Sequence, residues 1–285
     1  TVVAKIDQVN RTFVPHVLPV RVGTWVEFPN SDNVMHQVYS ISPAKRFQLP
    51  LYIGKPARPI QFDQPGVVAI GCSVALPHLF GQPGRNPLTP GGRVDYIYGL
   101  QSVLRVCISR EFTVFATGRA SPVTRWLRAL ARHEHARTGG PGVGMIGMCF
   151  TGGFALAAAI DPVVIAPVLS QPSLPTGSKR SAAAIDCSSE DIEVVARRCA
   201  REGLSVLGLR FEDDPHVPAA RFAFLKEKLG DGFVAVELPQ SAGHPLGPLP
   251  KRHSVLTGDL IDAPGEPTRA ALEQVLELFR RKLLA

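Results

Sequence analysis

A cysteine enclosed by glycines, Cys149, is the residue of this chain best suited to nucleophilic chemistry. Gly147 lies two residues before it and Gly152 three residues after it, and an Ala-rich helical pattern follows. This spacing is typical of a sharp strand-to-helix turn that holds a strained, exposed nucleophile. Because a helix N-terminus favours thiolate over thiol, Cys149 is predicted to be an activated nucleophile. The alternative is a buried cysteine in a glycine-rich turn.

A thiol nucleophile needs a base and a group that orients the base, and both have candidates downstream. In α/β-hydrolase-like folds the chain order is nucleophile, acid, histidine, with the acid just past a strand. Asp213 and Asp214 directly follow a predicted strand. His216 stands next to them and is expected at the surface. His244 and His253 both follow the last predicted strand, where the base belongs, so the residues alone leave these two open.

Strands and helices must alternate to bring these side chains together, and the chain after about residue 120 has that pattern. Continuous apolar runs predict buried parallel strands, and amphipathic runs predict helices. The expected strands cover 163–169, 204–211 and 233–238, and the expected helices cover 121–137, 189–202, 219–229 and 268–284. In the first helix, Trp126, Leu127, Leu130 and Ala131 are predicted to face inward. In the second, Cys199 is predicted to lie in the core.

The first 72 residues show a different pattern. Short apolar or alternating runs at 17–22, 24–28 and 36–39 are separated by turns rich in Pro, Gly and Asn, and no helix is expected. Strands at this spacing predict an antiparallel β-sandwich. The chain is therefore expected to hold a β segment, residues 1–73, followed by an α/β domain, residues 74–285.

Composition limits the classes of function. The chain has 285 residues, of which 45% are hydrophobic and 19% charged, as in soluble globular proteins. It contains no run of about 18 apolar residues, so no membrane partner is expected. The net charge is +7, but the basic residues are scattered with few aromatics between them, which disfavours nucleic-acid binding. Five cysteines without zinc spacing predict free thiols in a reducing compartment.

Residues 74–285 resemble the dienelactone hydrolase family. The matching blocks are 76–81 (Leu-Pro-His-Leu-Phe-Gly), 109–112 (Ser-Arg-Glu-Phe), 144–156, 166–172 and 253–257 (His-Ser-Val-Leu-Thr). The resemblance implies an α/β-hydrolase-like fold and hydrolysis of a small-molecule ester or lactone without a cofactor. Cys149 matches the family's nucleophile, Asp214 its acid in an Asp-x-x-Val-Pro loop, and His253 its base, with His244 second. The backbone N–H of Phe150 would be one oxyanion donor.

The hydrolase resemblance is incomplete at its N-terminal side. The family's domain begins upstream of the 76–81 block, with a loop that carries a Glu against the nucleophile and the second oxyanion donor. The residues before Val74 do not match these elements. Glu111 belongs to a different block, where a structural salt bridge is its expected role. We therefore expect the activity to be weakened.

Residues 1–72 resemble a cupredoxin of the plastocyanin-like, methylamine-utilisation type, through 13–15, 20–32, 36 and 62–72. His36 and Cys72 match two of that family's copper ligands. Ala75 stands where the second histidine belongs and His78 where the methionine belongs, and no counterpart of the closing strand follows. A thiolate, two imidazoles and a thioether suit copper electron transfer, so this site is incomplete. An unused His and Cys in a sandwich remnant is the favoured interpretation.

The two resemblances meet near residues 72–75, as though two partial families were joined there. The leading hypothesis is a hydrolase that uses Cys149, Asp214 and His253. The alternatives are a copper electron-transfer module with a degenerate hydrolase domain, and a non-functional hybrid. The hydrolase family implies a cytoplasmic protein, whereas the cupredoxin segment would imply the periplasm; the cytoplasm is the expected location.

Overall fold

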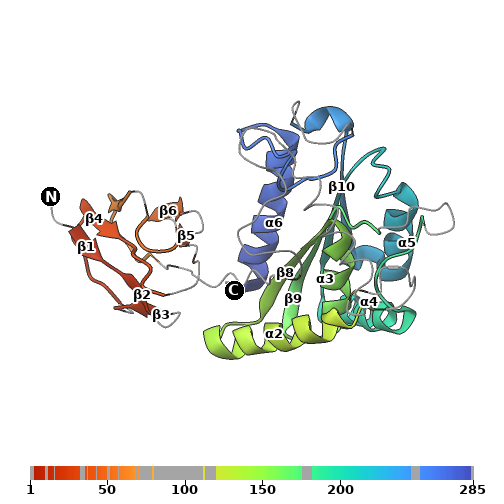
Figure 1. Ribbon diagram of the computed structural model, residues 1–285, viewed down its shortest axis with the longest axis horizontal. Coiled ribbons are helices and arrows are strands. Elements are labelled where there is room, and N and C mark those ends of the chain that lie inside the picture. The colour runs from red at the N-terminus through yellow and green to blue at the C-terminus, as the bar shows by residue number, and fades with distance from the viewer. Residues whose placement is uncertain are drawn as a thin grey trace, which may run out of the picture. The chain divides into compact units, whose positions relative to one another are not determined.

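A computed structural model of the protein describes residues 3–9, 12–15, 17–32, 36, 38–42, 44–49, 52–56, 58–68, 70, 79, 112, 120–174, 182–244 and 251–283 (Figure 1). The chain separates into two units, Thr1–Pro77 and His78–Ala285, and each has a hydrophobic core of its own. None of the helices in the described residues combines the length with the hydrophobicity that crossing a bilayer requires.

The second unit is built on a parallel four-stranded sheet of order β11-β10-β9-β8. Its strands are β8 (Val143–Met148), β9 (Val164–Ser170), β10 (Val206–Phe211) and β11 (Phe233–Leu238). The three strands predicted from apolar runs are confirmed. In a parallel sheet all carboxyl ends lie at one edge, so the segments that follow these strands can meet there.

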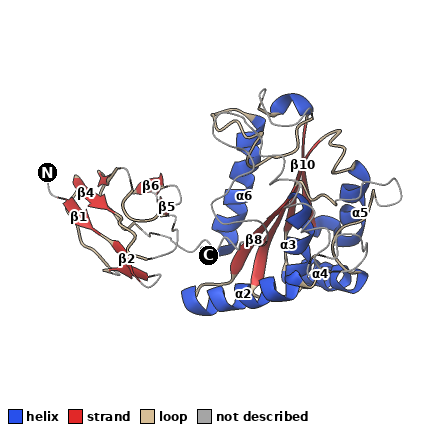
Figure 2. Cartoon of the chain, in the orientation of Figure 1, coloured by secondary structure: helices blue, strands red, loops and turns tan. Residues whose placement is uncertain are grey.

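Helices cover both faces of this sheet, which gives an α/β architecture (Figure 2). They are α2 (Val123–Thr138), α3 (Gly152–Ala158), α4 (Ser189–Glu202), α5 (Ala219–Leu229) and α6 (Pro267–Leu283). On one face Leu169 and Val206 pack with residues of α2, α3, α4 and α5. On the other face Val168 and Leu209 pack with α6. This two-sided burial explains why the two central strands, β9 and β10, are almost wholly apolar and do not alternate.

The predicted helices are confirmed, with one error in the burial of α2. Trp126 is 50% exposed, whereas Val123, Leu127 and Ala131 are buried. Those three residues recur every four positions and therefore share one helix face. Trp126 lies about 100° around the helix from Leu127, because each turn holds 3.6 residues. The prediction that Trp126 faces inward was wrong.

The first unit consists of short strands in small separate sheets. One sheet contains β1 (Val3–Lys5), β4 (Thr24–Glu27) and β7 (Ile60–Phe62), and two further pairs join β2 (Asp7–Val9) to β3 (Thr12–Val14) and β5 (Tyr39–Ser42) to β6 (Lys45–Gln48). Val26, Phe28 and Val38 are buried in its core, where Phe28 lies against Phe47 with 5.4 Å between ring centroids.

Two details of the first unit differ from expectation. β1 pairs parallel with β4, so the pairing is not antiparallel throughout. Residues 17–22 are not a strand, and Val17 is 77% exposed. Pro19 interrupts this run and cannot donate a backbone hydrogen bond to a neighbouring strand. The apolar pattern there was therefore misleading.

Candidate active site

The turn between β8 and α3 has the geometry that its glycines predict. Cys149 opens the 3-10 turn η1 (Cys149–Thr151) with a left-handed φ of 54°. A Cβ on Gly147 would lie 2.2 Å from the Thr151 carbonyl oxygen, and one on Gly152 would lie 2.6 Å from Pro172 Cα. Both contacts are too close for any larger residue. The chain therefore turns sharply at Cys149, as in a nucleophile elbow.

Three side chains that are distant in the sequence form one connected chain at the carboxyl edge of the sheet. Cys149 Sγ lies 3.3 Å from His253 Nε2, and His253 Nδ1 lies 2.7 Å from Asp214 Oδ2. Asp214 follows β10 and His253 follows β11. Asp214 is 2% exposed and His253 is 6% exposed, whereas Cys149 is partly exposed. Cys149 is thus the most exposed of the three residues.

The other two candidate histidines occupy different places. The His244 backbone N–H donates to the carbonyl of Asp259 at 2.9 Å, near the start of the loop that leads to His253. His216 is exposed, as expected, and its ring stands edge-on to that of His253 with 5.3 Å between centroids. Its backbone N–H donates to Asp214 Oδ1 at 2.9 Å. The ring that contacts the Cys149 sulfur is that of His253.

A buried carboxylate that sequence reasoning missed, Asp259, holds the loop of the base. Asp259 Oδ2 accepts hydrogen bonds from the backbone N–H groups of His253, at 2.9 Å, and Ser254, at 3.0 Å. Arg252 pairs with the other carboxylate oxygen at 3.6 Å. The position of the His253 ring therefore depends on a residue six positions further along. A single acidic residue in a loop gives no sequence signal for this role.

The pKa values of the Cys149 thiol and the His253 imidazole are shifted in opposite directions, and each shift favours the charged form of its own group. Burial opposes ionisation of Cys149, but hydrogen bonds with His253 and Ser173 outweigh it and lower the pKa of the thiol. Burial also opposes protonation of His253, but its hydrogen bonds with Asp214 and Cys149 raise its pKa to about 9. These opposite shifts favour a thiolate beside an imidazolium. A thiolate is the nucleophilic form of cysteine.

A second residue that the sequence did not single out, Ser173, contacts the sulfur directly. Its Oγ lies 3.1 Å from Cys149 Sγ, and its backbone N–H donates to the Cys149 carbonyl at 2.9 Å. Ser173 lies three residues after the end of β9, directly after Gln171 and Pro172. Its only sequence signal is this place just past a predicted strand.

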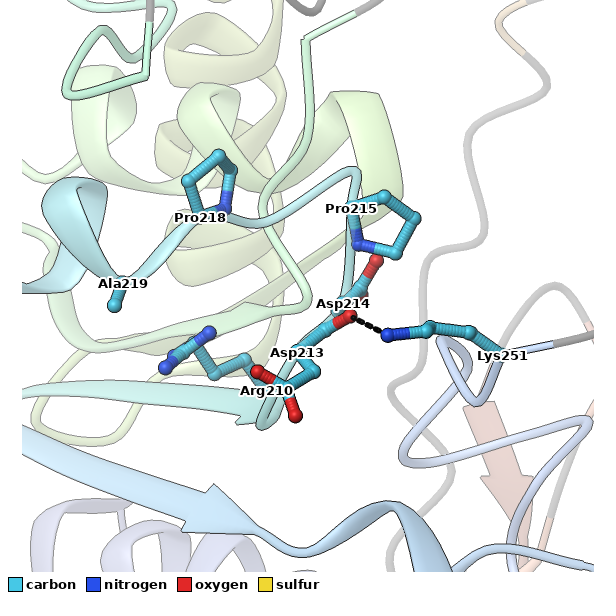
Figure 3. A pocket seen from close by; sticks show the side chains of 7 residues that line it. All are labelled: Arg210, Asp213, Asp214, Pro215, Pro218, Ala219 and Lys251. Carbon is cyan, nitrogen blue, oxygen red and sulfur yellow. Dashed lines mark hydrogen bonds between the residues drawn. The ribbon is translucent and has the colours of Figure 1, made fainter. Parts of the chain in front are cut away.

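A cavity of about 310 Å³ opens beside the acid and not at the thiol (Figure 3). It is lined by Arg210, Asp213, Asp214, Pro215, Pro218, Ala219 and Lys251. Across it, Lys251 Nζ donates to the Asp213 carbonyl at 3.3 Å. Because neither Cys149 nor His253 lines this cavity, a substrate bound there would not meet the nucleophile.

The first residues of α3, the helix that follows the turn at Cys149, pack against Asp186, which is buried. A Cβ on Gly153 would lie 2.8 Å from Asp186 Cβ, so the helix and this residue are in close contact. Burial raises the pKa of Asp186 to about 6, although hydrogen bonds from the Ser121 hydroxyl and backbone N–H act in the opposite direction. The folded protein therefore binds this proton more tightly than the unfolded chain does.

The sign of this shift predicts how Asp186 affects stability. Its contribution is fully present below about pH 4 and is lost as the pH rises through about 6, at a cost of about 2 to 3 kcal/mol. Asp186→Asn keeps an acceptor for the Ser121 N–H and stays neutral. We expect it to be more stable than the native protein at pH 7.5, with the difference vanishing near pH 4 in urea unfolding. The exposed Asp231→Asn is the control, and a pH-independent difference for Asp186→Asn would contradict the prediction.

Of the two expected copper ligands, only His36 lies in the described residues. His36 is buried, and its Nε2 lies 2.8 Å from Asp32 Oδ2. Cys72, Ala75 and His78 lie outside the described residues, as does Glu111. In the part of the chain that the structure describes, no three His, Cys, Asp or Glu side chains are grouped to hold a metal. His36 and its carboxylate alone do not fit a copper centre.

Neither a family model nor a curated protein matches the chain. The geometry around Cys149 therefore carries the functional assignment.

Proposed function

We propose that the second unit is a carboxylic ester or lactone hydrolase of the dienelactone hydrolase type. Cys149 is the nucleophile, His253 the general acid and base, and Asp214 the group that orients His253. The observation that carries this proposal is the chain of contacts from Cys149 Sγ to His253 (3.3 Å) and on to Asp214 (2.7 Å). A nucleophile in contact with a base that a third group orients is the arrangement of covalent hydrolases.

In the first half-reaction the Cys149 thiolate adds to the carbonyl carbon of the substrate. The carbon–sulfur bond forms while the carbonyl π electrons move to oxygen, and the Phe150 backbone N–H donates to that oxyanion. When the oxyanion collapses, the bond to the leaving alkoxide breaks, and the His253 imidazolium gives the alkoxide its proton. The products are an alcohol and a thioester on Cys149. A lactone would stay attached as the thioester of its own hydroxy acid.

In the second half-reaction the neutral imidazole of His253 takes a proton from water. The resulting hydroxide adds to the thioester carbonyl, and the carbon–sulfur bond then breaks to release the carboxylic acid and the thiolate. The acid loses its proton, and the thiolate again faces the imidazolium. Asp214, fixed by its bond to Nδ1, keeps Nε2 directed at the sulfur throughout.

Packing around Phe150 supports its role as the oxyanion donor. Its ring meets Phe154 at 5.6 Å and Phe112 at 6.0 Å, both edge-on. Leu79 packs against the same cluster. Leu79 and Phe112 belong to two of the blocks that resemble the hydrolase family, and these two residues meet beside the elbow. A residue anchored by aromatic contacts can hold its N–H in a fixed direction, which oxyanion stabilisation requires.

Trapping of the thioester tests the proposal. On mixing the protein with p-nitrophenyl acetate and quenching in acid, we expect an acetyl group on the peptide that contains Cys149, by mass spectrometry. The acetyl group should be removed by neutral hydroxylamine, which cleaves thioesters. Cys199 in the same digest is the control, because burial raises the pKa of its thiol and should leave it unmodified. Ester turnover with no acetyl group on Cys149 would overturn the proposal.

A further inference from the structure

Three non-glycine residues of the described chain have a left-handed backbone: Cys149 (φ 54°), Gln171 (φ 39°) and Asp213 (φ 54°). They follow the carboxyl ends of three neighbouring parallel strands, β8, β9 and β10. This conformation is costly outside glycine and persists where the surroundings enforce it, often at active sites. Two of the three turns present Cys149 and Asp214. The third, after β9, presents Ser173.

The turn that presents Ser173 is fixed by its backbone to both neighbouring strands. The Gln171 N–H donates to the Leu209 carbonyl of β10 at 2.7 Å. The Ser173 N–H donates to the Cys149 carbonyl at 2.9 Å, at the elbow that follows β8. Gln171 is itself buried. The Ser173 hydroxyl is therefore held at the sulfur by a turn with little freedom to move.

A buried arginine adds a further support. Arg221 Nη1 donates to the Pro172 carbonyl at 2.7 Å and to the His216 carbonyl at 3.0 Å. Pro172 directly precedes Ser173, and His216 lies two residues after Asp214. The guanidinium thus joins the turn of Ser173 to the loop of the acid. Hydrogen bonds to a charged donor are among the stronger ones in proteins.

We propose that Ser173 is a catalytic residue of the Cys149 site, whose hydroxyl donates a hydrogen bond to the sulfur and holds it as the thiolate until it attacks. The 3.1 Å separation of Oγ and Sγ places the hydroxyl in contact with the reacting atom. A thiolate has no proton to donate, so in that state Ser173 must be the donor. No proton is transferred in this step. The inference deepens the proposed hydrolase function and rests on it.

The pH dependence of alkylation by iodoacetamide tests this role, with the rate at Cys149 followed by peptide mass spectrometry. Ser173→Thr keeps the hydroxyl. Ser173→Val has the same shape as Ser173→Thr but has a methyl group in place of the hydroxyl. Loss of a hydrogen bond to a charged group should raise the midpoint of the rate profile by about one pH unit in Ser173→Val. Ser173→Thr should keep the native midpoint. The exposed Ser241→Ala is a further control that should match the native protein.

The alkylation rates of Ser173→Val and the native protein should cross as the pH rises. A thiolate of higher pKa is also more nucleophilic, with a Brønsted coefficient of about 0.4–0.5. Ser173→Val should therefore react about threefold more slowly than the native protein at pH values below both midpoints and about threefold faster at pH values above both midpoints. A variant that merely disturbed the fold would be slower, or faster, at all pH values. If Ser173→Val folds poorly, Ser173→Ala is measured against the native protein in the same way.

Equal midpoints for Ser173→Val and Ser173→Thr, or a raised midpoint in both, would overturn the inference, because the hydroxyl would then have no effect of its own. Alkylation needs no ester turnover, so the two proposals fail separately. A raised midpoint in Ser173→Val without any esterase activity in the native protein would refute the hydrolase function alone. Normal turnover with equal midpoints would refute the role of Ser173 alone.

Discussion

Cys149→Ala is expected to lower kcat/KM for p-nitrophenyl acetate by about 1000-fold or more, because the thioester on Cys149 can no longer form. The alanine fits the turn, since it removes one sulfur atom and adds no bulk. Residual hydrolysis would come from binding and from the Phe150 N–H. Release of p-nitrophenolate at pH 7.5, with thermal unfolding to confirm that the variant is folded, measures the effect.

Cys199→Ala is the matched control for the loss of a cysteine. Cys199 lies in α4, is partly buried, and packs against the core on the far side of the sheet from α6. Its removal should change turnover by no more than about twofold, as is usual away from a functional site. Undiminished activity in Cys149→Ala would mean that the observed hydrolysis arises elsewhere.

His253→Ala is expected to lower kcat by about 100- to 10,000-fold, the range found for a positioned acid–base group. Two losses combine in this variant. The leaving alkoxide and the attacking water no longer have a proton donor and acceptor, and the Cys149 thiol loses a hydrogen bond that lowers its pKa. Steady-state ester hydrolysis gives the first effect, and slower iodoacetamide labelling of Cys149 at neutral pH gives the second.

His244→Ala separates the two histidines that the sequence left open. Its backbone N–H, which donates to Asp259, is kept in this variant, so the loop of the base should stay in place. We expect turnover within about twofold of the native value. A large loss in His244→Ala together with little loss in His253→Ala would reverse the assignment of the base.

The features predicted best from the sequence are those with local causes. Gly147 and Gly152 are required by contacts within the elbow and with Pro172 in the turn after β9, and their spacing around Cys149 is visible in the sequence. The buried strands are continuous apolar runs of a length typical of strands, and they are followed by turn residues. Trp126 shows the limit of such patterns, because an error of one position in a helix moves a side chain about 100° around its axis.

The features that the sequence did not predict depend on contacts between distant segments. Spacing alone left His253 and His244 open, and only the family resemblance favoured His253. In the structure the place of the His253 ring follows from the path of residues 251–259, which is fixed by the hydrogen bonds of Asp259. Ser173 reaches the sulfur because β9 lies next to β8 and because Gln171 adopts a left-handed φ. Neither a lone serine nor a lone aspartate has a spacing that reveals these roles.

The hydrogen bonds of Arg221 have a mechanical consequence. Separation of the turn at Pro172 from the acid loop at His216 would break at least one of the two bonds that a single buried nitrogen of Arg221 makes. The turn at Pro172 is also bound to the elbow through Ser173, so nucleophile and acid belong to a single rigid part. The base stands on another loop, which is joined to the acid loop by the buried bond of His253 to Asp214, at 2.7 Å, and by an exposed hydrogen bond of Lys251. Any breathing of the site that keeps the bond of His253 to Asp214 should therefore change the distance from imidazole to sulfur only as far as the imidazole can turn about that bond.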